Sequence, residues 1–192
     1  MTPERNKRMM EVLSKRQFDI TLVLENVWDP HNISAVLRSC DAVGIQDVYV
    51  ISPGGKRESK LGKKSSASAS KWLTIHHYYD VAECFETVRK RYTNIFSTRL
   101  QQDSTELYEI DFCQPMALVF GNEKEGVSEQ ASSLSDGNFI IPQVGMIKSL
   151  NISVACAITL YECYRQRKIS GMYDLPAKNE QTNELYKEWN SF

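Results

Sequence analysis

Four polar or glycine-containing stretches each follow a predicted strand, and these are the positions where the chain could carry chemistry. They are Asn26, His31 and Asn32 after the strand at 20–25, Arg99 after 94–98, the loop GNEKEG (121–126) after 116–121, and PQVGMIKSLN (142–151) after 138–141. In open parallel sheets, ligands bind beyond the carboxyl ends of the strands. We therefore expect these groups to share one site.

Glycines on two of these loops favour a pocket built largely from backbone. Gly121, Gly126 and Gly145 allow the chain to approach a flat ligand closely, and the small residues at 153–157 allow the same. GNEKEG lacks the Lys-Ser/Thr ending of a phosphate-binding loop, and no GxGxxG follows the first strand. The pattern suits a small uncharged ring, although ordinary turn chemistry accounts for the glycines equally well.

The elements that position these groups alternate between strands and helices. This alternation predicts an α/β fold, with a mostly parallel sheet covered by helices on both faces. We expect strands at 20–25, 47–51, 72–77, 94–98, 116–121 and 138–141, and helices at 3–16, from Asn32 to Gly44, at 81–91 and at 149–168. A last amphipathic segment carries Leu185, Tyr186 and Trp189.

Composition excludes several classes of protein. The 192 residues are 42% apolar and 24% charged with a net charge of −1, which is ordinary for one globular domain. Five cysteines without a CxxC pair argue against a disulfide framework and against a zinc site, so most are expected in the core. No signal peptide or membrane-spanning run is visible, which predicts a cytoplasmic protein without membrane or metal partners.

Three long motifs, in order and widely separated, identify a family. NISAVLRSCDAVG (32–44), LVFGNEKEGVS (118–128) and IPQVGMIKSLNISVA (141–155) resemble the motifs of the SPOUT superfamily of RNA methyltransferases. The similarity is greatest to the TrmH type, which methylates the 2′-hydroxyl of the guanosine at position 18 in the D-loop of tRNA. It extends over about residues 2–174, and the tail beyond Asp174 carries no motif.

The resemblance implies a deep trefoil knot at the C-terminal end, S-adenosylmethionine as cofactor, and a homodimer whose sites are completed by the partner. By motif position, it places cofactor contacts at Thr98, Gly121, Ile141 and Leu150, and catalytic functions at Asn32, Arg38, Glu123, Ser149 and Asn151. Several of these residues could instead have a simpler structural function: Asn32 and Ser149 are good helix N-caps, and Glu123 could be a solvated loop acid. Arg38 could form a surface ion pair with Asp41 at i+3.

The resemblance assigns Arg38 as the activating residue, but a guanidinium accepts a proton poorly. We therefore favour Arg38 as a cation that stabilises the forming alkoxide, with His31 as the rival general base.

Basic residues outside the motifs predict RNA contacts. The family matches are Arg5, Arg8, Arg165 and Arg167, and the residues themselves add a lysine-rich loop with Lys60, Lys63 and Lys64. Such cations mostly contact phosphates. We expect an N-terminal basic helix (1–18), a methyltransferase domain (19–168) and a helical tail (169–192).

Three alternative functions remain open. The same chemistry could act on ribosomal RNA or on the tRNA wobble nucleotide. A non-catalytic RNA-binding member of the fold need not bind S-adenosylmethionine, and a small-molecule-binding α/β protein would have no affinity for RNA.

Overall fold

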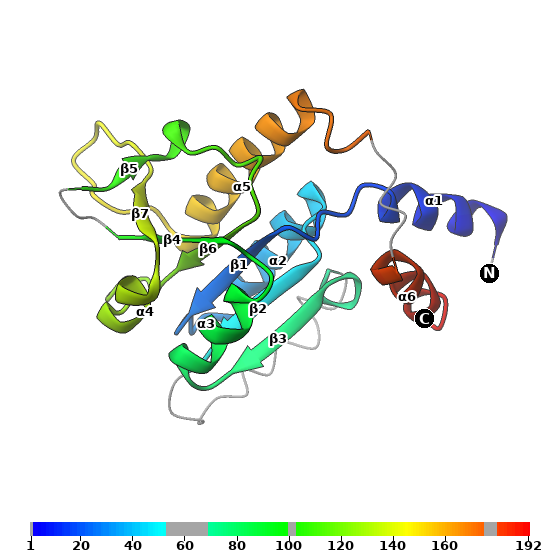
Figure 1. The fold of residues 1–192 in the computed structure, drawn as a ribbon, viewed down its shortest axis with the longest axis horizontal. Helices are drawn as coiled ribbons and strands as arrows, with labels where there is room; N and C mark the ends of the chain where they lie inside the picture. Colours follow the sequence, from blue (N-terminus) through cyan, green and yellow to red (C-terminus); the bar gives the residue numbers. More distant parts are fainter. Residues whose placement is uncertain (1, 53–68, 100–102, 175–179) are drawn as a thin grey trace.

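A single parallel sheet organises the chain in the computed structural model, which describes residues 2–52, 69–99, 103–174 and 180–192 (Figure 1). The strands are β1 (Ile20–Glu25), β2 (Asp47–Ile51), β3 (Thr74–Tyr78), β4 (Asn94–Thr98), β5 (Thr105–Glu106), β6 (Met116–Phe120) and β7 (Gly137–Ile140). They form a seven-stranded sheet in the order β3-β2-β1-β6-β4-β7-β5, and every neighbouring pair is parallel. The predicted α/β class and parallel sheet are confirmed.

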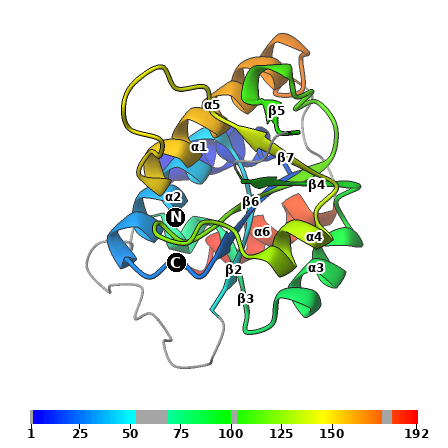
Figure 2. The ribbon, with the colours of Figure 1, turned by 90° about the vertical axis from the view of Figure 1, so that its left-hand side faces the viewer.

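Helices cover both faces of this sheet (Figure 2). α2 (Pro30–Val43) and α5 (Ile152–Ile169) pack together on one face, whereas α3 (Val81–Arg89) and α4 (Glu129–Leu134) lie on the other. Successive strand residues point to opposite faces, so Leu22 and Leu24 enter the α2–α5 core while Val23 enters the other core. Burial on both faces explains why β1, β2 and β6 are almost continuously apolar.

The two terminal helices pack against each other, away from the main core (Figure 1). α1 (Pro3–Leu13) and α6 (Glu180–Trp189) share a small cluster in which Trp189 lies edge-on against Trp72, with 5.1 Å between ring centroids. The predicted helical tail therefore has a structural role: it covers the N-terminal helix.

Arg16 belongs to this packing rather than to a basic surface. We expected the first helix to reach about Arg16, but it ends at Leu13. The Arg16 side chain is fully buried, and it donates to the Asp41 carboxylate at 2.6 Å and to the Ile45 carbonyl at 3.0 Å.

Helix starts differ from the prediction by a few residues because other residues cap them. α2 begins at Pro30 with Asp29 as N-cap, not at Asn32, since the Asp29 carboxylate accepts from the His31 amide at 2.8 Å. α5 begins at Ile152 and is capped by Asn151, not by Ser149. Gly44 ends α2 in the left-handed conformation (φ 86°), as predicted.

Several short elements were not predicted. They are β5, α4 and the 3-10 turns Ser70–Trp72 and Leu107–Glu109. Two predicted elements are also shorter in the structure, since α3 ends at Arg89 and β3 begins at Thr74.

Four cysteines are core residues, as expected: Cys40, Cys84, Cys156 and Cys163 are buried. Burial raises the pKa of the Cys84 thiol to about 12, so it stays protonated at neutral pH.

Within the described ranges, no group of three or more His, Cys, Asp or Glu side chains could hold a metal ion. No helix in the same ranges is long and apolar enough to cross a bilayer.

Candidate active site

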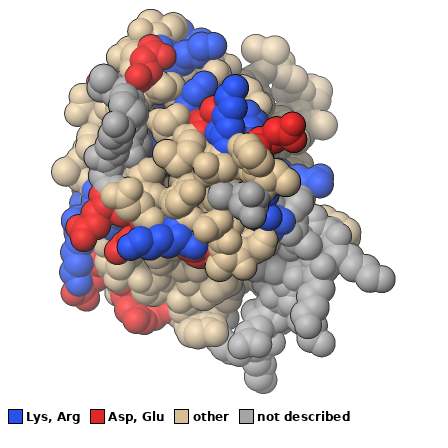
Figure 3. Space-filling model, turned by 90° about the vertical axis from the view of Figure 1, so that its right-hand side faces the viewer, with Lys and Arg blue, Asp and Glu red and all other residues tan. Residues whose placement is uncertain are grey.

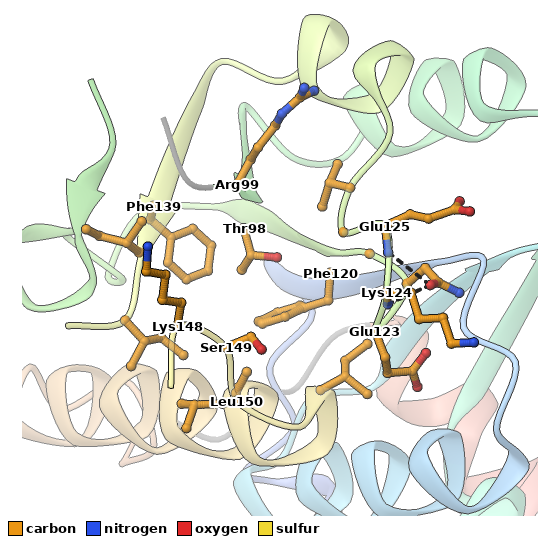
Figure 4. Close-up of a pocket in the computed structure, with 18 of the residues that line it drawn as sticks. Thr98, Arg99, Phe120, Glu123, Lys124, Glu125, Phe139, Lys148, Ser149 and Leu150 are labelled. Atoms are coloured by element: carbon orange, nitrogen blue, oxygen red, sulfur yellow. Dashed lines mark hydrogen bonds between the residues drawn. The ribbon is translucent and has the colours of Figure 1, made fainter. Parts of the chain in front are cut away.

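A cavity of about 490 Å³ opens where β4, β6 and β7 end (Figure 4). Its walls come from Thr98 at the end of β4 with Arg99 after it, the GNEKEG loop after β6 and the segment between β7 and α5. These three chain segments are far apart in sequence. The parallel sheet brings them together because it places all strand ends at one edge.

The floor of the cavity is apolar. Phe120 and Phe139 are nearly completely buried and meet edge-to-face, with 6.0 Å between ring centroids. Thr98 lies beside them, and its hydroxyl donates to the Val119 carbonyl at 3.1 Å, which leaves little free hydrogen-bonding capacity in the floor. Such a surface suits the face of an uncharged aromatic ring.

One wall is a closed backbone turn formed by the GNEKEG loop. The Asn122 amide donates to the Gly126 carbonyl at 3.1 Å, and the Gly126 amide donates back to the Asn122 carbonyl at 2.8 Å. The buried Asn122 side chain holds the turn from inside, since its Oδ1 accepts from the Lys124 amide at 2.8 Å and from the Glu125 amide at 3.2 Å. Gly126 has a φ of 70°, which glycine adopts without strain.

All four residues predicted to contact the cofactor line this one cavity: Thr98, Gly121, Ile141 and Leu150. Ser149, from the catalytic set, lines it as well, and its hydroxyl is exposed there because Asn151, not Ser149, caps α5 (Figure 4). The structure thus brings together residues that lie up to 52 positions apart in the chain, from Thr98 to Leu150.

Three further predicted residues form a hydrogen-bonded chain at the rim of the cavity. Asn32 donates from Nδ2 to the Glu123 carboxylate at 2.7 Å, and Asn151 donates from Nδ2 to Asn32 Oδ1 at 3.2 Å. Asn151 Oδ1 accepts from the Ser153 amide at 2.9 Å, which fixes its orientation. Glu123 is therefore not simply a solvated acid, and Asn32 does not cap α2. The chain connects one residue from each of the three motifs.

Arg38 and His31 lie outside the cavity lining of their own chain. Arg38 is exposed on α2, and Asp41, its alternative ion-pair partner at i+3, accepts from Arg16 instead. His31 is exposed in the first turn of α2, where its backbone amide is held by Asp29.

Several residues of the cavity were expected at this edge of the sheet but were assigned no catalytic or cofactor-binding function. Three cations line it, Arg99, Lys124 and Lys148, and Arg99 extends toward α4, where it pairs with Glu129 at 3.3 Å (Figure 4). Arg99 was expected here because it directly follows β4, and it lines the cavity as expected. Asn122 had no comparable signal, since its function is to close a turn whose shape appears only in three dimensions.

The predicted RNA-contact arginines separate into exposed and buried ones. Arg5 and Arg8 are exposed on α1, and Arg165 is exposed on α5, paired through two hydrogen bonds with Glu162 at 2.7 and 2.8 Å. Arg167 is a correction: its side chain is fully buried and cannot contact RNA. The lysine-rich loop with Lys60, Lys63 and Lys64 lies outside the described residues.

Arg167 instead ties the end of α5 to the start of the sheet. It donates to the Phe112 carbonyl at 2.8 Å, the Gln114 carbonyl at 3.2 Å, Gln17 Oε1 at 3.0 Å and the Asp19 carboxylate at 2.5 Å. The residues of α5 alone could not reveal this, because the partners of Arg167 come from distant loops.

We expect Arg167→Met to lower the free energy of unfolding by about 3 kcal/mol, since it leaves an Asp19 carboxylate and two carbonyls without their donor. Arg165→Ala, two residues away and exposed, should change stability by less than about 0.5 kcal/mol but weaken RNA binding. Urea unfolding and RNA binding at several salt concentrations measure both. Equal stability of the two variants would contradict this assignment.

The face that carries α1 and α6 has mixed charge (Figure 3). Lysine and arginine side chains alternate there with aspartate and glutamate, and no continuous basic surface is visible among the atoms that the view shows. RNA contacts on this side would therefore depend on a few individual cations.

Comparison with known proteins agrees with this geometry. Residues 19–161 match the SpoU rRNA Methylase family. The chain is 41% identical over 97% of its length to the tRNA (guanosine(18)-2'-O)-methyltransferase of Thermus thermophilus, covering 94% of that protein. It is 36% identical over 90% of its length to the Escherichia coli protein of the same name, of which it covers 75%.

Solved structures share the fold. The A. aeolicus TrmH/SpoU tRNA modifying enzyme superposes with a TM-score of 0.89 at 37% identity, covering 98% of this chain and 95% of that one. The SpoU methyltransferase AviRb from Streptomyces viridochromogenes, in complex with the cofactor AdoMet, gives a TM-score of 0.69 at 26% identity, covering 79% of this chain and 59% of that one. The motifs, the parallel sheet and the cavity at its carboxyl edge are thus those of a methyltransferase fold, and the chain belongs to the SpoU methylase family.

Proposed function

We propose that this protein transfers the methyl group of S-adenosylmethionine to the ribose 2′-hydroxyl of the D-loop guanosine at position 18 of tRNA. The observation that carries the proposal is the cavity, which residues of the second and third motifs line and to which hydrogen bonds join Asn32 of the first motif at the rim. Relatives of nearly the same length are named for that reaction. The relatives of matching length favour tRNA over ribosomal RNA as substrate.

The cavity fits the cofactor by its chemistry. Its Phe120–Phe139 floor suits the adenine face, and the backbone walls at Gly121, Ile141 and Leu150 suit the ring edges. The bound cofactor supplies an electrophilic methyl group on a sulfonium. No metal is needed, because the sulfonium already activates the methyl carbon.

For this transfer the ribose 2′-hydroxyl would have to give up its proton, to water or to a basic side chain such as His31, as its oxygen becomes bonded to the methyl group. Residues of the chain must therefore hold the hydroxyl in line and stabilise the negative charge on its oxygen. We assign the alignment to Ser149 and to the Glu123–Asn32–Asn151 chain, and the charge stabilisation to Arg38. Phosphates of the same RNA would be bound by Arg5, Arg8 and Arg165.

We further propose that the active form is a homodimer with shared sites. Val144, Met146 and Ile147 are 107%, 97% and 73% exposed in the segment after β7, and Val154 and Tyr161 are exposed on α5. Large exposed apolar residues grouped in this way favour an interface between proteins. A shared site also accounts for Arg38, which lies outside the cavity lining of its own chain.

The remaining features that the family implies are proposals of the same kind. Two features of the chain path support a trefoil knot. β7 is inserted in the sheet between β4 and β5, and after β7 the chain returns across the molecule so that α5 packs on α2. A reducing cytoplasm is supported by five free cysteines.

The test is methylation of an unmodified tRNA pool with labelled S-adenosylmethionine, followed by nucleoside mapping. We expect label only in 2′-O-methylguanosine of the D-loop, and none in a tRNA with 2′-deoxyguanosine at that position. Label in the wobble nucleotide or in ribosomal RNA fragments would reassign the substrate, and cofactor binding without any transfer would indicate a non-catalytic protein.

A further inference from the structure

Trp28 differs from the other tryptophans in being exposed. Trp72 and Trp189 pack against each other in the cluster of α1 and α6. Trp28 is 52% exposed and lies between the carboxyl end of β1 and the start of α2. It is therefore presented at the same edge of the sheet as the cavity.

The ring is held in place by its only polar group. Trp28 Nε1 donates to Asn26 Oδ1 at 2.5 Å. The indole N–H is thus satisfied inside the protein, and the part of the ring left to solvent is apolar. A single exposed apolar side chain is ordinary on a protein surface, so the fixed orientation of this ring, and not its exposure, is what bears on its function.

The segment that carries Trp28 is also fixed on both sides. Val27 is buried in the main core, and Asp29 caps α2. Asn26 adopts a left-handed conformation (φ 55°), which asparagine tolerates better than most residues, and its amide donates to the Ile51 carbonyl at 2.8 Å. The ring is therefore preorganised and loses little freedom when a partner covers it.

Hydrogen bonds connect this segment to the cavity wall. Asn122, which lines the cavity and closes the GNEKEG turn, donates from Nδ2 to the Asn26 carbonyl at 2.9 Å. The neighbouring residue Glu123 accepts from Asn32 in the first turn of α2. Trp28 thus stands beside the residues assigned to ribose alignment, and its position is set by the same turn.

We propose that Trp28 is a stacking platform for an unpaired nucleobase of the RNA substrate, at the target nucleotide or the one next to it. An enzyme that methylates a ribose in a loop meets unstacked bases, and an immobilised aromatic ring binds their faces regardless of base identity. This inference rests on the proposed function, because it requires an RNA substrate at this edge. It adds a residue outside the three motifs to RNA recognition.

The test compares three variants of the full-length protein with substrate tRNA. Trp28→Ala should weaken tRNA binding, or raise KM for tRNA, on the order of tenfold, the loss typical of one stacked base. Trp28→Phe keeps a flat ring and should retain most of the affinity. Asn26→Gly keeps the positive φ but removes the acceptor that fixes the indole, and should give an intermediate loss. Affinity for S-adenosylmethionine should be unchanged in all three.

Tyr79→Ala is the matched control, because Tyr79 is 54% exposed but follows β3, the edge strand of the sheet that lies farthest from the strands of the cavity. If the wild-type protein methylates tRNA and Trp28→Ala binds tRNA with wild-type affinity, the inference is overturned and the proposed function stands. Loss of the dimer in Trp28→Ala, measured by light scattering, also overturns it, because Trp28 would then be an interface residue. Quenching of Trp28 fluorescence by tRNA, seen in wild type and absent from Trp28→Phe, would support it.

Discussion

Arg38→Ala is expected to remove methyl transfer while cofactor binding survives. Arg38 does not line the cavity, so S-adenosylmethionine should bind with unchanged affinity. The cation that stabilises the forming alkoxide is lost, and the removal of one such group typically lowers kcat by about 10²–10³-fold. Single-turnover methylation of tRNA and calorimetric titration of the cofactor measure the two effects separately.

His31→Ala is the comparison that separates a cation from a base. If Arg38 acts by its charge, Arg38→Lys should recover part of the rate and His31→Ala should stay near wild type. A collapse of activity in His31→Ala, with Arg38→Lys tolerated, would transfer the central function to histidine. Near-normal turnover of Arg38→Ala would remove Arg38 from the mechanism.

Gly121→Ala is expected to abolish cofactor binding. A Cβ at this position would lie 2.1 Å from the carbonyl carbon of Gly126 and 2.2 Å from the amide nitrogen of Val127. Both are backbone atoms of the closed turn, so the whole wall must move, and the affinity should fall by at least about 100-fold, or about 2.7 kcal/mol. The strain should also lower the free energy of unfolding by about 1–3 kcal/mol.

Gly145→Ala provides the matched control, since no atom lies within 4 Å of its added Cβ. The same chemical change there should leave stability and cofactor affinity close to wild type. Equilibrium dialysis with labelled cofactor and thermal unfolding test both variants. Cofactor binding by Gly121→Ala at wild-type affinity would show that the ligand sits elsewhere.

Mixing the two inactive variants tests the shared site. In a heterodimer of Arg38→Ala and Gly121→Ala, one site combines an intact cavity with an intact Arg38 from the other protomer. Activity should then return to a fraction of wild type after subunit exchange. If no activity returns although heterodimers form, Arg38 serves the cavity of its own chain.

The fold class was open to prediction because it depends on local pattern. Short apolar stretches separated by amphipathic ones predict buried parallel strands, and the bounds of β1, β2 and β4 agree with the structure. Gly44 marked the end of α2 because few other residues adopt the left-handed conformation at a helix end. The grouping of Thr98, Gly121, Ile141 and Leu150 followed from motif position.

Capping and ion pairing were harder to predict because several residues compete for one function. Asp29 and Asn32 are both good N-caps, and only the backbone path assigns the cap to Asp29, which leaves Asn32 free to reach Glu123. Asp41 was within reach of Arg38 in sequence, but Arg16 approaches it from outside α2 and takes the contact.

The sequence by itself determined the alternation of strands and helices, the glycines of the cavity wall and the polar residues at its rim, because these depend on residue type and spacing along the chain. Tertiary structure alone decided which charged groups are buried and which are free. Arg167 and Arg165 are two positions apart on one helix, yet distant loops enclose the first and leave the second in solvent. The same is true of Trp28. The segment that carries it is held by a hydrogen bond from Asn122 to the Asn26 carbonyl, and these two residues lie 96 positions apart in the chain.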